Sequence, residues 1–77
     1  MSRLPIVDSK TLEKILLKLG FTLVRQKGSH AFYRHANGKY TTLPHHPARD
    51  LGRSLIRRIL KEINLSPEDF TDILKKL

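Results

Sequence analysis

The stretch Phe21–Leu43, F-T-L-V-R-Q-K-G-S-H-A-F-Y-R-H-A-N-G-K-Y-T-T-L, decides the fold of this chain. It contains three runs rich in β-branched and aromatic residues, separated by Gly28-Ser29 and by Ala36-Asn37-Gly38. Short runs of this composition between turn residues are typical of strands. Asparagine and glycine adopt the positive φ that tight hairpins require. The stretch therefore predicts a three-stranded antiparallel meander.

The expected strands are Phe21–Lys27, His30–His35 and Tyr40–Leu43. Pro44 ends the third strand because proline has no N–H to donate to the sheet. Apolar and polar residues alternate in each strand, so we expect one face of the sheet to be buried and the other to be wet. The alternation leaves open which set of side chains faces inward.

A helix is expected before the strands. Asp8 or Ser9 begins it, because a short side-chain oxygen satisfies free N–H groups of the first turn. Apolar residues then follow at helical spacing and form one stripe: Leu12, Ile15, Leu16 and Leu19. Gly20 ends the helix in the left-handed conformation that favours glycine.

Two further helices are expected after the strands. Residues 45–50 form a loop, and Asp50 is the expected cap of the next helix. The apolar stripe of that helix is wide and consists of Leu51, Leu55, Ile56, Ile59, Leu60 and Ile63. Ser66 begins the last helix, with Pro67 in its first turn. Its apolar residues are Phe70, Ile73, Leu74 and Leu77.

The predicted order of elements is α-β-β-β-α-α, which gives an α+β fold of two layers with the helices on one face of the sheet. Residues 1–77 are expected to form a single domain with a thin core. Residues 1–7 form a short lead-in. A helix, a three-stranded meander and a helix is also the order of double-stranded-RNA-binding domains, but the order alone does not establish a function.

The charge of the chain points to a polyanionic partner. Fifteen Lys and Arg face seven Asp and Glu, which gives a net charge of +8. Such a balance in a small domain favours RNA, DNA, an anionic membrane or an acidic protein as partner. There is no cysteine, which fits a reducing compartment. We see neither a secretory leader nor an apolar run long enough to span a bilayer.

His30 is the strongest candidate for chemistry. It follows a glycine turn, where its ring is exposed and its direction is fixed by the strand, and Arg25, Lys27 and Arg34 are close in sequence. These residues fit RNA cleavage without a metal. A histidine removes the 2′-hydroxyl proton, the oxygen attacks the adjacent phosphorus, and cations stabilise the phosphorane. The alternative is an ordinary histidine near a turn.

The remaining histidines raise the question of a metal site. His45 and His46, joined by His30 or His35, are possible zinc ligands. Adjacent histidines converge poorly on one ion, however, and the sequence contains no H-x-x-x-H pair. We therefore expect no metal and no other cofactor, and assign the pair to phosphate contact or proton donation.

Two further groups of residues have either a functional or a purely structural role. Arg53, Arg57 and Lys61 follow one another at intervals of four residues, so they either lie along a phosphate backbone or form a solvated helix face. The aromatic residues that either stack on bases or pack in the core are Phe32, Tyr33 and Tyr40.

Several segments together resemble one known family. These are G-F-T-L-V-R-Q-K-G-S-H-A-F-Y-R-H at residues 20–35, N-G at 37–38, P-H-H at 44–46, Leu51, I-L-K at 59–61 and L-S-P-E-D-F at 65–70. In this order they resemble the HicA toxin family, the YcfA-like mRNA interferases. The resemblance covers nearly the whole chain.

The resemblance implies a fold, an activity and a partner. Family members are small toxins with a double-stranded-RNA-binding-like fold that cleave mRNA without a metal, and a HicB antitoxin masks their active face. It also implies a bacterial or archaeal cytoplasm. The catalytic histidine of the family falls on His30, and Gly28 and Ser29 match the preceding motif positions. His46 matches a recurrent histidine, although His45 leaves that alignment open by one residue.

The sequence thus predicts a metal-independent endoribonuclease toxin that acts on single-stranded mRNA. His30 is its expected catalytic base, with Ser29 and His46 in support. The expected RNA-binding residues are Arg25, Lys27, Gly28, Arg34, Arg53 and Arg57. The alternatives are a non-catalytic RNA-binding module of the double-stranded type and a protein-interaction module with a basic face.

Overall fold

A computed structural model describes residues 4–46 and 49–77. In these residues the elements are α1 (Ser9–Lys18), β1 (Thr22–Lys27), β2 (His30–Arg34), β3 (Tyr40–Pro44), α2 (Arg53–Glu62) and α3 (Pro67–Lys75). Their order confirms the expected α-β-β-β-α-α succession and the α+β class. Parts of the expected lead-in and loop, residues 1–3 and 47–48, lie outside the described residues.

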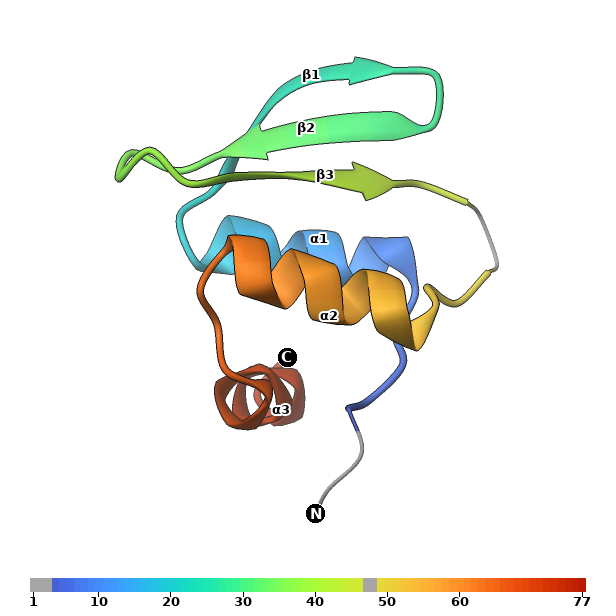
Figure 1. Ribbon diagram of the computed structural model, residues 1–77, viewed down its shortest axis with the longest axis vertical. Coiled ribbons are helices and arrows are strands. Elements are labelled where there is room, and N and C mark those ends of the chain that lie inside the picture. The colour runs from blue at the N-terminus through green and yellow to red at the C-terminus, as the bar shows by residue number, and fades with distance from the viewer. Residues whose placement is uncertain (1–3, 47–48) are drawn as a thin grey trace.

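The three strands form an antiparallel sheet in the order β1-β2-β3, and α1 and α2 both pack against β3. Figure 1 shows α3 beyond these two helices, on the side away from the sheet. Two helices rather than three therefore cover the sheet. The third adds to the core through Phe70, which is fully buried.

The buried face of the sheet is now defined. Ala31 and Tyr33 of β2, and Thr41 and Leu43 of β3, are buried against the helices. Because successive side chains on a strand point to opposite faces, His30, Phe32 and Arg34 lie on the other, open face. The stripes of α1 and α2 supply six of the buried apolar residues: Leu12, Ile15, Leu16, Ile56, Ile59 and Leu60.

The connection from α1 to β1 is held by a histidine. Gly20 has a φ of +98°, as expected for the residue that ends the helix. A Cβ on Gly20 would lie 3.0 Å from Nε2 of His35. The Nδ1 of His35 accepts a hydrogen bond from the Asn37 N–H, so its Nε2 donates to the Leu19 carbonyl at 3.1 Å. His35 therefore serves the fold.

The helix starts were predicted with mixed success. The Asp8 carboxylate accepts from the Thr11 N–H at 2.9 Å, and Ser66 caps α3 in the same way. The expected cap of α2 was wrong, because α2 starts after Gly52 with no side-chain cap. Asp50 instead forms a β-bridge with Asp8. Buried Leu51 explains the difference, since its N–H donates to the Val7 carbonyl and keeps this segment extended.

Strand β1 departs from the expected alternation. All six of its residues are exposed, so neither of its faces is buried. Its pairing with β2 also contains a bulge between Leu23 and Arg25. In Figure 1, β1 is the strand farthest from α1 and α2, beyond the cover that these helices provide. The sequence pattern could not show that α1 and α2 do not extend far enough across the sheet to cover β1.

Candidate functional site

The turn that carries His30 joins β1 to β2. Gly28 has a φ of +60°, a conformation that most side chains avoid. The backbone N–H of His45, which follows β3, donates to the Ser29 carbonyl at 2.6 Å. His30 comes next, at the first position of β2, and it is exposed. The turn is thus fixed from one side by the chain that leaves β3, while the histidine faces solvent.

Two cations of β1 share the open face with His30. Lys27 pairs directly with His30, and Arg25 pairs with Phe32. Residues directly opposite in an antiparallel pair lie on the same face. Arg34 is also on this face, but it is four residues along β2 from His30, which corresponds to about 13 Å. The structure therefore brings Lys27 next to His30 and leaves Arg34 at the other end of the strand.

The open face also carries an aromatic pair. The rings of Phe32 and Tyr40 are 5.6 Å apart, and Tyr40 is 60% exposed. Tyr33, the third aromatic considered for base stacking, is fully buried on the opposite face. Of the two alternatives for Tyr33, the structure therefore favours packing in the core, whereas Phe32 and Tyr40 offer ring surface beside the basic residues.

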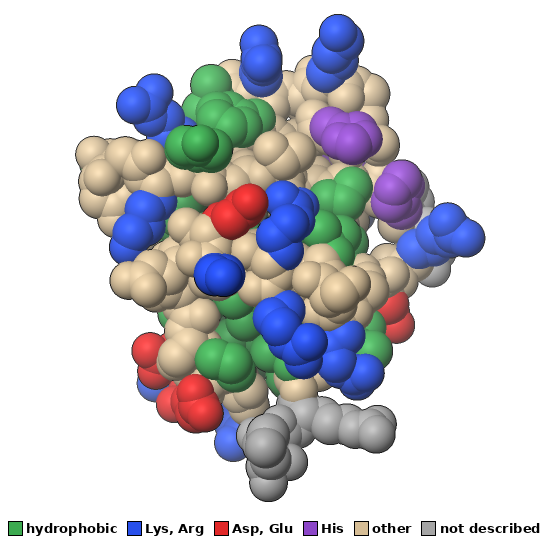
Figure 2. Space-filling view, viewed as in Figure 1, with side chains coloured by type: hydrophobic (Ala, Val, Ile, Leu, Met, Phe, Trp, Pro, Cys, Tyr) green, Lys and Arg blue, Asp and Glu red, His purple; other side chains and the backbone are tan. Residues whose placement is uncertain are grey.

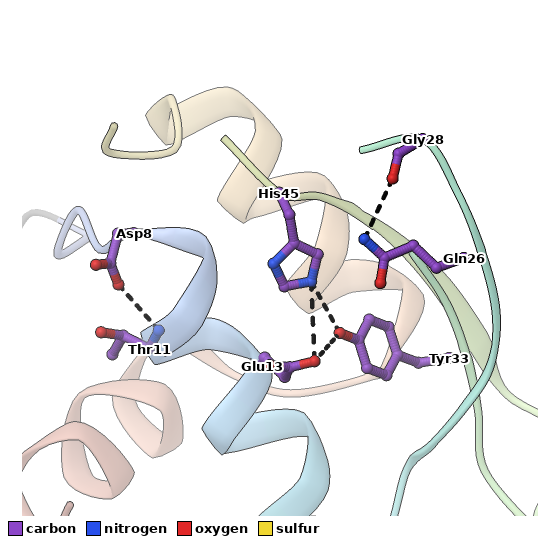
Figure 3. Close-up of polar contacts among 7 residues, drawn as sticks. All are labelled: Asp8, Thr11, Glu13, Gln26, Gly28, Tyr33 and His45. Carbon is purple, nitrogen blue, oxygen red and sulfur yellow. Dashed lines mark hydrogen bonds and ion pairs between the residues drawn. The ribbon is translucent and has the colours of Figure 1, made fainter. Parts of the chain in front are cut away.

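Figure 3 shows where Tyr33 points instead: its hydroxyl meets Glu13 of α1 and His45. The Tyr33 Oη donates to the Glu13 carboxylate at 2.5 Å and lies 3.0 Å from the His45 Nε2. Since the phenol proton is given to Glu13, Nε2 of His45 is the donor in the second bond. Burial, with the hydrogen bond to Glu13 and its charge, raises the pKa of Tyr33 well above its usual range.

The two adjacent histidines have different environments. His45 is held in this Glu13–Tyr33–His45 network, and its Nε2 lies 3.8 Å from the Glu13 carboxylate. His46 is exposed and lies in a hollow that Arg49 and Leu55 also line. The sequence did not single out Glu13 or Arg49. Nothing in its periodicity links Glu13 to a tyrosine twenty residues later.

Two residues of the expected RNA-binding set lie on α2, in the helical layer rather than on the open face. The Arg53 Nε donates to the Leu4 carbonyl at 3.1 Å, while Arg57 is exposed. In Figure 2, Lys and Arg side chains are spread over the helical layer as well as near the sheet. The structure therefore does not bring Arg53 and Arg57 onto one surface with His30.

Within residues 4–46 and 49–77, no group of three His, Asp or Glu side chains is placed to hold a metal ion. Of the histidines weighed for zinc, His35 and His45 have their Nε2 atoms in hydrogen bonds. In the same part of the chain, no helix has the length and apolar character needed to cross a bilayer.

Comparison with known families gives one match. The family model described as HicA toxin of bacterial toxin-antitoxin matches residues 9–65. These residues include α1, the sheet and α2, and they end before α3. No curated protein matches the chain.

Proposed function

This chain belongs to the HicA toxin family of bacterial toxin–antitoxin systems, and we propose that it is a metal-independent endoribonuclease that cleaves single-stranded mRNA. A HicB-type antitoxin neutralises it. The proposal is carried by one observation: His30 is exposed on an open, basic sheet face with Lys27 directly opposite it.

In the proposed reaction His30 acts as general base. It removes the proton of a ribose 2′-hydroxyl, and the oxygen attacks the adjacent phosphorus. The Lys27 ammonium stabilises the negative charge of the phosphorane. The bond from phosphorus to the 5′-oxygen then breaks, and that oxygen takes a proton. The products are a 2′,3′-cyclic phosphate and a free 5′-hydroxyl.

The proton for the leaving oxygen comes from protonated His30 or from a second group. We propose His46 as that second group because it is exposed and follows Pro44, which pairs with His30. Ser29 supports the reaction by its place in the turn, where its carbonyl is fixed by the His45 N–H.

RNA would bind along the open face of the sheet. Arg25 and Arg34 contact phosphates at increasing distance from the reacting one, in the same direction along the sheet. Gly28 lets the backbone approach closely, and Phe32 and Tyr40 stack on unpaired bases. A single strand suits this surface because its bases are free to stack and its backbone can align for attack. Arg53 and Arg57 are proposed only as contacts to flanking RNA, since they lie in the helical layer.

A non-catalytic RNA-binding module is the second candidate. It is favoured by the exposed Phe32–Tyr40 pair, which would hold RNA whether or not cleavage follows. The two functions differ in their products, because only an enzyme yields new RNA ends.

A substrate with one altered position tests the proposed reaction. A single-stranded RNA is first cut to map the cleaved bond, and the same RNA is then made with one 2′-deoxy residue before that bond. We expect a 2′,3′-cyclic phosphate from the first RNA and no cleavage of the second at that bond. Equal cleavage of both would exclude attack by the 2′-hydroxyl.

A further inference from the structure

Strand β1 leaves two apolar residues about half exposed to solvent. Leu23 is 45% exposed and Val24 53%, although both belong to a strand. Apolar residues in strands are normally buried on at least one face. Figure 1 shows why these are not: β1 is the strand farthest from the two helices that cover the sheet.

The two edges of the sheet differ. At the β3 edge, Arg58 Nη2 donates to the Thr42 carbonyl at 3.4 Å, and Thr41 Oγ1 donates to Glu62 Oε1 at 2.7 Å. Helix α2 therefore supplies side chains to that strand. In the described part of the chain, β1 pairs with β2 alone. Its outer main-chain groups are thus available to another strand.

We infer that β1 is the docking strand for the antitoxin, which adds an extended, acidic segment beside it as a fourth strand. Only the identity of the partner rests on the proposed function, because membership of a toxin family implies an antitoxin. In such an addition, main-chain hydrogen bonds give affinity and alternate side chains enter pockets. A hollow of about 430 Å³ that Val24 lines with Thr22 and Arg34 would receive one of these side chains.

The positive charge of β1 favours an acidic strand as its partner. Arg25 and Lys27 lie on β1, and the chain carries a net charge of +8. A second copy of this chain would be repelled, and both the charges and the bulge at Leu23/Arg25 are features that keep edge strands from pairing with one another. An acidic strand turns the same cations into attractive contacts.

An acidic protein fits this strand better than RNA does. Phosphates would contact Arg25 and Lys27, but they would leave Leu23 and Val24 in water. A strand with alternating apolar residues would bury them. Because β1 ends at Lys27, which pairs directly with His30, the added strand would lie one strand away from His30. Its acidic side chains would pair with Arg25 and Lys27 and so keep RNA phosphates from these cations.

Binding to the antitoxin tests the inference. We would use the His30→Ala chain, in which RNA cleavage is expected to be slower by about 10²-fold or more. The antitoxin would be the protein encoded beside this chain's gene, and calorimetry would measure the affinity. Leu23→Ser/Val24→Ser should weaken binding at least tenfold. The matched control is Leu17→Ser/Leu77→Ser, which alters residues that are 50% and 53% exposed on other parts of the fold. It should bind within about twofold of the parent.

Hydrogen exchange on the unsubstituted β1 provides a second measurement that no folding defect can affect. The amides of residues 22–27 should exchange at least tenfold more slowly in the complex. Unchanged affinity of the β1 variant, an equal loss in the control, or no protection of β1 would each overturn the inference. So would a β1 variant that loses RNA affinity while keeping the antitoxin.

The inference and the proposed function fail separately. A wild-type chain that never cuts RNA but binds the antitoxin through β1 overturns the endoribonuclease proposal and keeps the docking strand. A chain that cuts RNA but binds the antitoxin through a surface other than β1 keeps the endoribonuclease proposal and overturns the docking strand.

Discussion

The phenolic oxygen of Tyr33 lies 3.0 Å from Nε2 of His45, and the same oxygen donates its proton to Glu13. One buried hydroxyl thus joins α1, β2 and the segment that leaves β3. The backbone N–H of His45 also holds the carbonyl of Ser29, the residue before His30. The network therefore links the helical layer to the turn that carries the proposed catalytic base.

Tyr33→Phe should lower the free energy of unfolding by about 1–2 kcal/mol, because it keeps the buried ring and removes two hydrogen bonds. Urea denaturation measures the change. Tyr40→Phe is the matched control: its ring is 60% exposed, so its stability should stay within about 0.5 kcal/mol of wild type. Equal effects of the two variants would contradict the role given to the Tyr33 hydroxyl.

Gly20→Ala should destabilise the fold more than Gly28→Ala. Both glycines have a positive φ, but only at Gly20 does an added Cβ meet a neighbour, Nε2 of His35 at 3.0 Å. We expect a loss of about 1 kcal/mol for Gly28→Ala and at least about 2 kcal/mol for Gly20→Ala. Thermal and urea unfolding would show the order, and a reversed order would refute this account of the α1–β1 connection.

Asp8→Ala should lower the melting temperature at neutral pH, because Asp8 caps α1. Hydrogen bonds from Thr11 hold the pKa of Asp8 below its usual value. The stabilisation is therefore present above the unfolded pKa of about 3.9 and is lost as pH falls through the folded pKa.

The difference in melting temperature between wild type and Asp8→Ala should accordingly be largest near neutral pH and shrink in acid. Asp72→Ala serves as control, since Asp72 is an exposed acid within α3. A difference that is constant down to the most acid pH would mean that the charged cap is not what stabilises α1.

Lys27→Ala and Arg34→Ala should affect cleavage in different ways. Lys27 is directly opposite His30, so its loss should reduce kcat about 10²-fold or more by removing charge stabilisation of the phosphorane. Arg34 is about 13 Å along the strand, so its loss should mainly raise KM. Steady-state kinetics on one defined RNA separates the two effects. Similar kcat values for the two variants would mean that the reacting phosphate does not lie beside Lys27.

The sequence predicted most of the fold because its local signals agree with one another. Glycine at the end of α1, the Asn37-Gly38 hairpin and the Ser66 cap each specify a boundary through local chemistry, and the structure confirms them. The cap of α2 was wrong because a tertiary contact, the burial of Leu51, overrides the local preference of Asp50.

The candidate site was less predictable. Local sequence placed His30 at a turn beside Lys27, since the hairpin fixes both positions. It did not indicate that Tyr33 faces the helices, because alternation gives two equivalent faces until the helical layer chooses one. The Glu13–Tyr33–His45 contact and the exposure of β1 depend on how elements distant in the chain pack.

The most direct test of the central claim is cleavage of a single-stranded RNA in EDTA by wild type and His30→Ala, followed on a gel. His30→Ala should keep its melting temperature, because the exposed ring contributes little packing. The account predicts that wild type cuts the RNA in EDTA and that His30→Ala is slower by about 10²-fold or more. Cleavage by His30→Ala at the wild-type rate would contradict it.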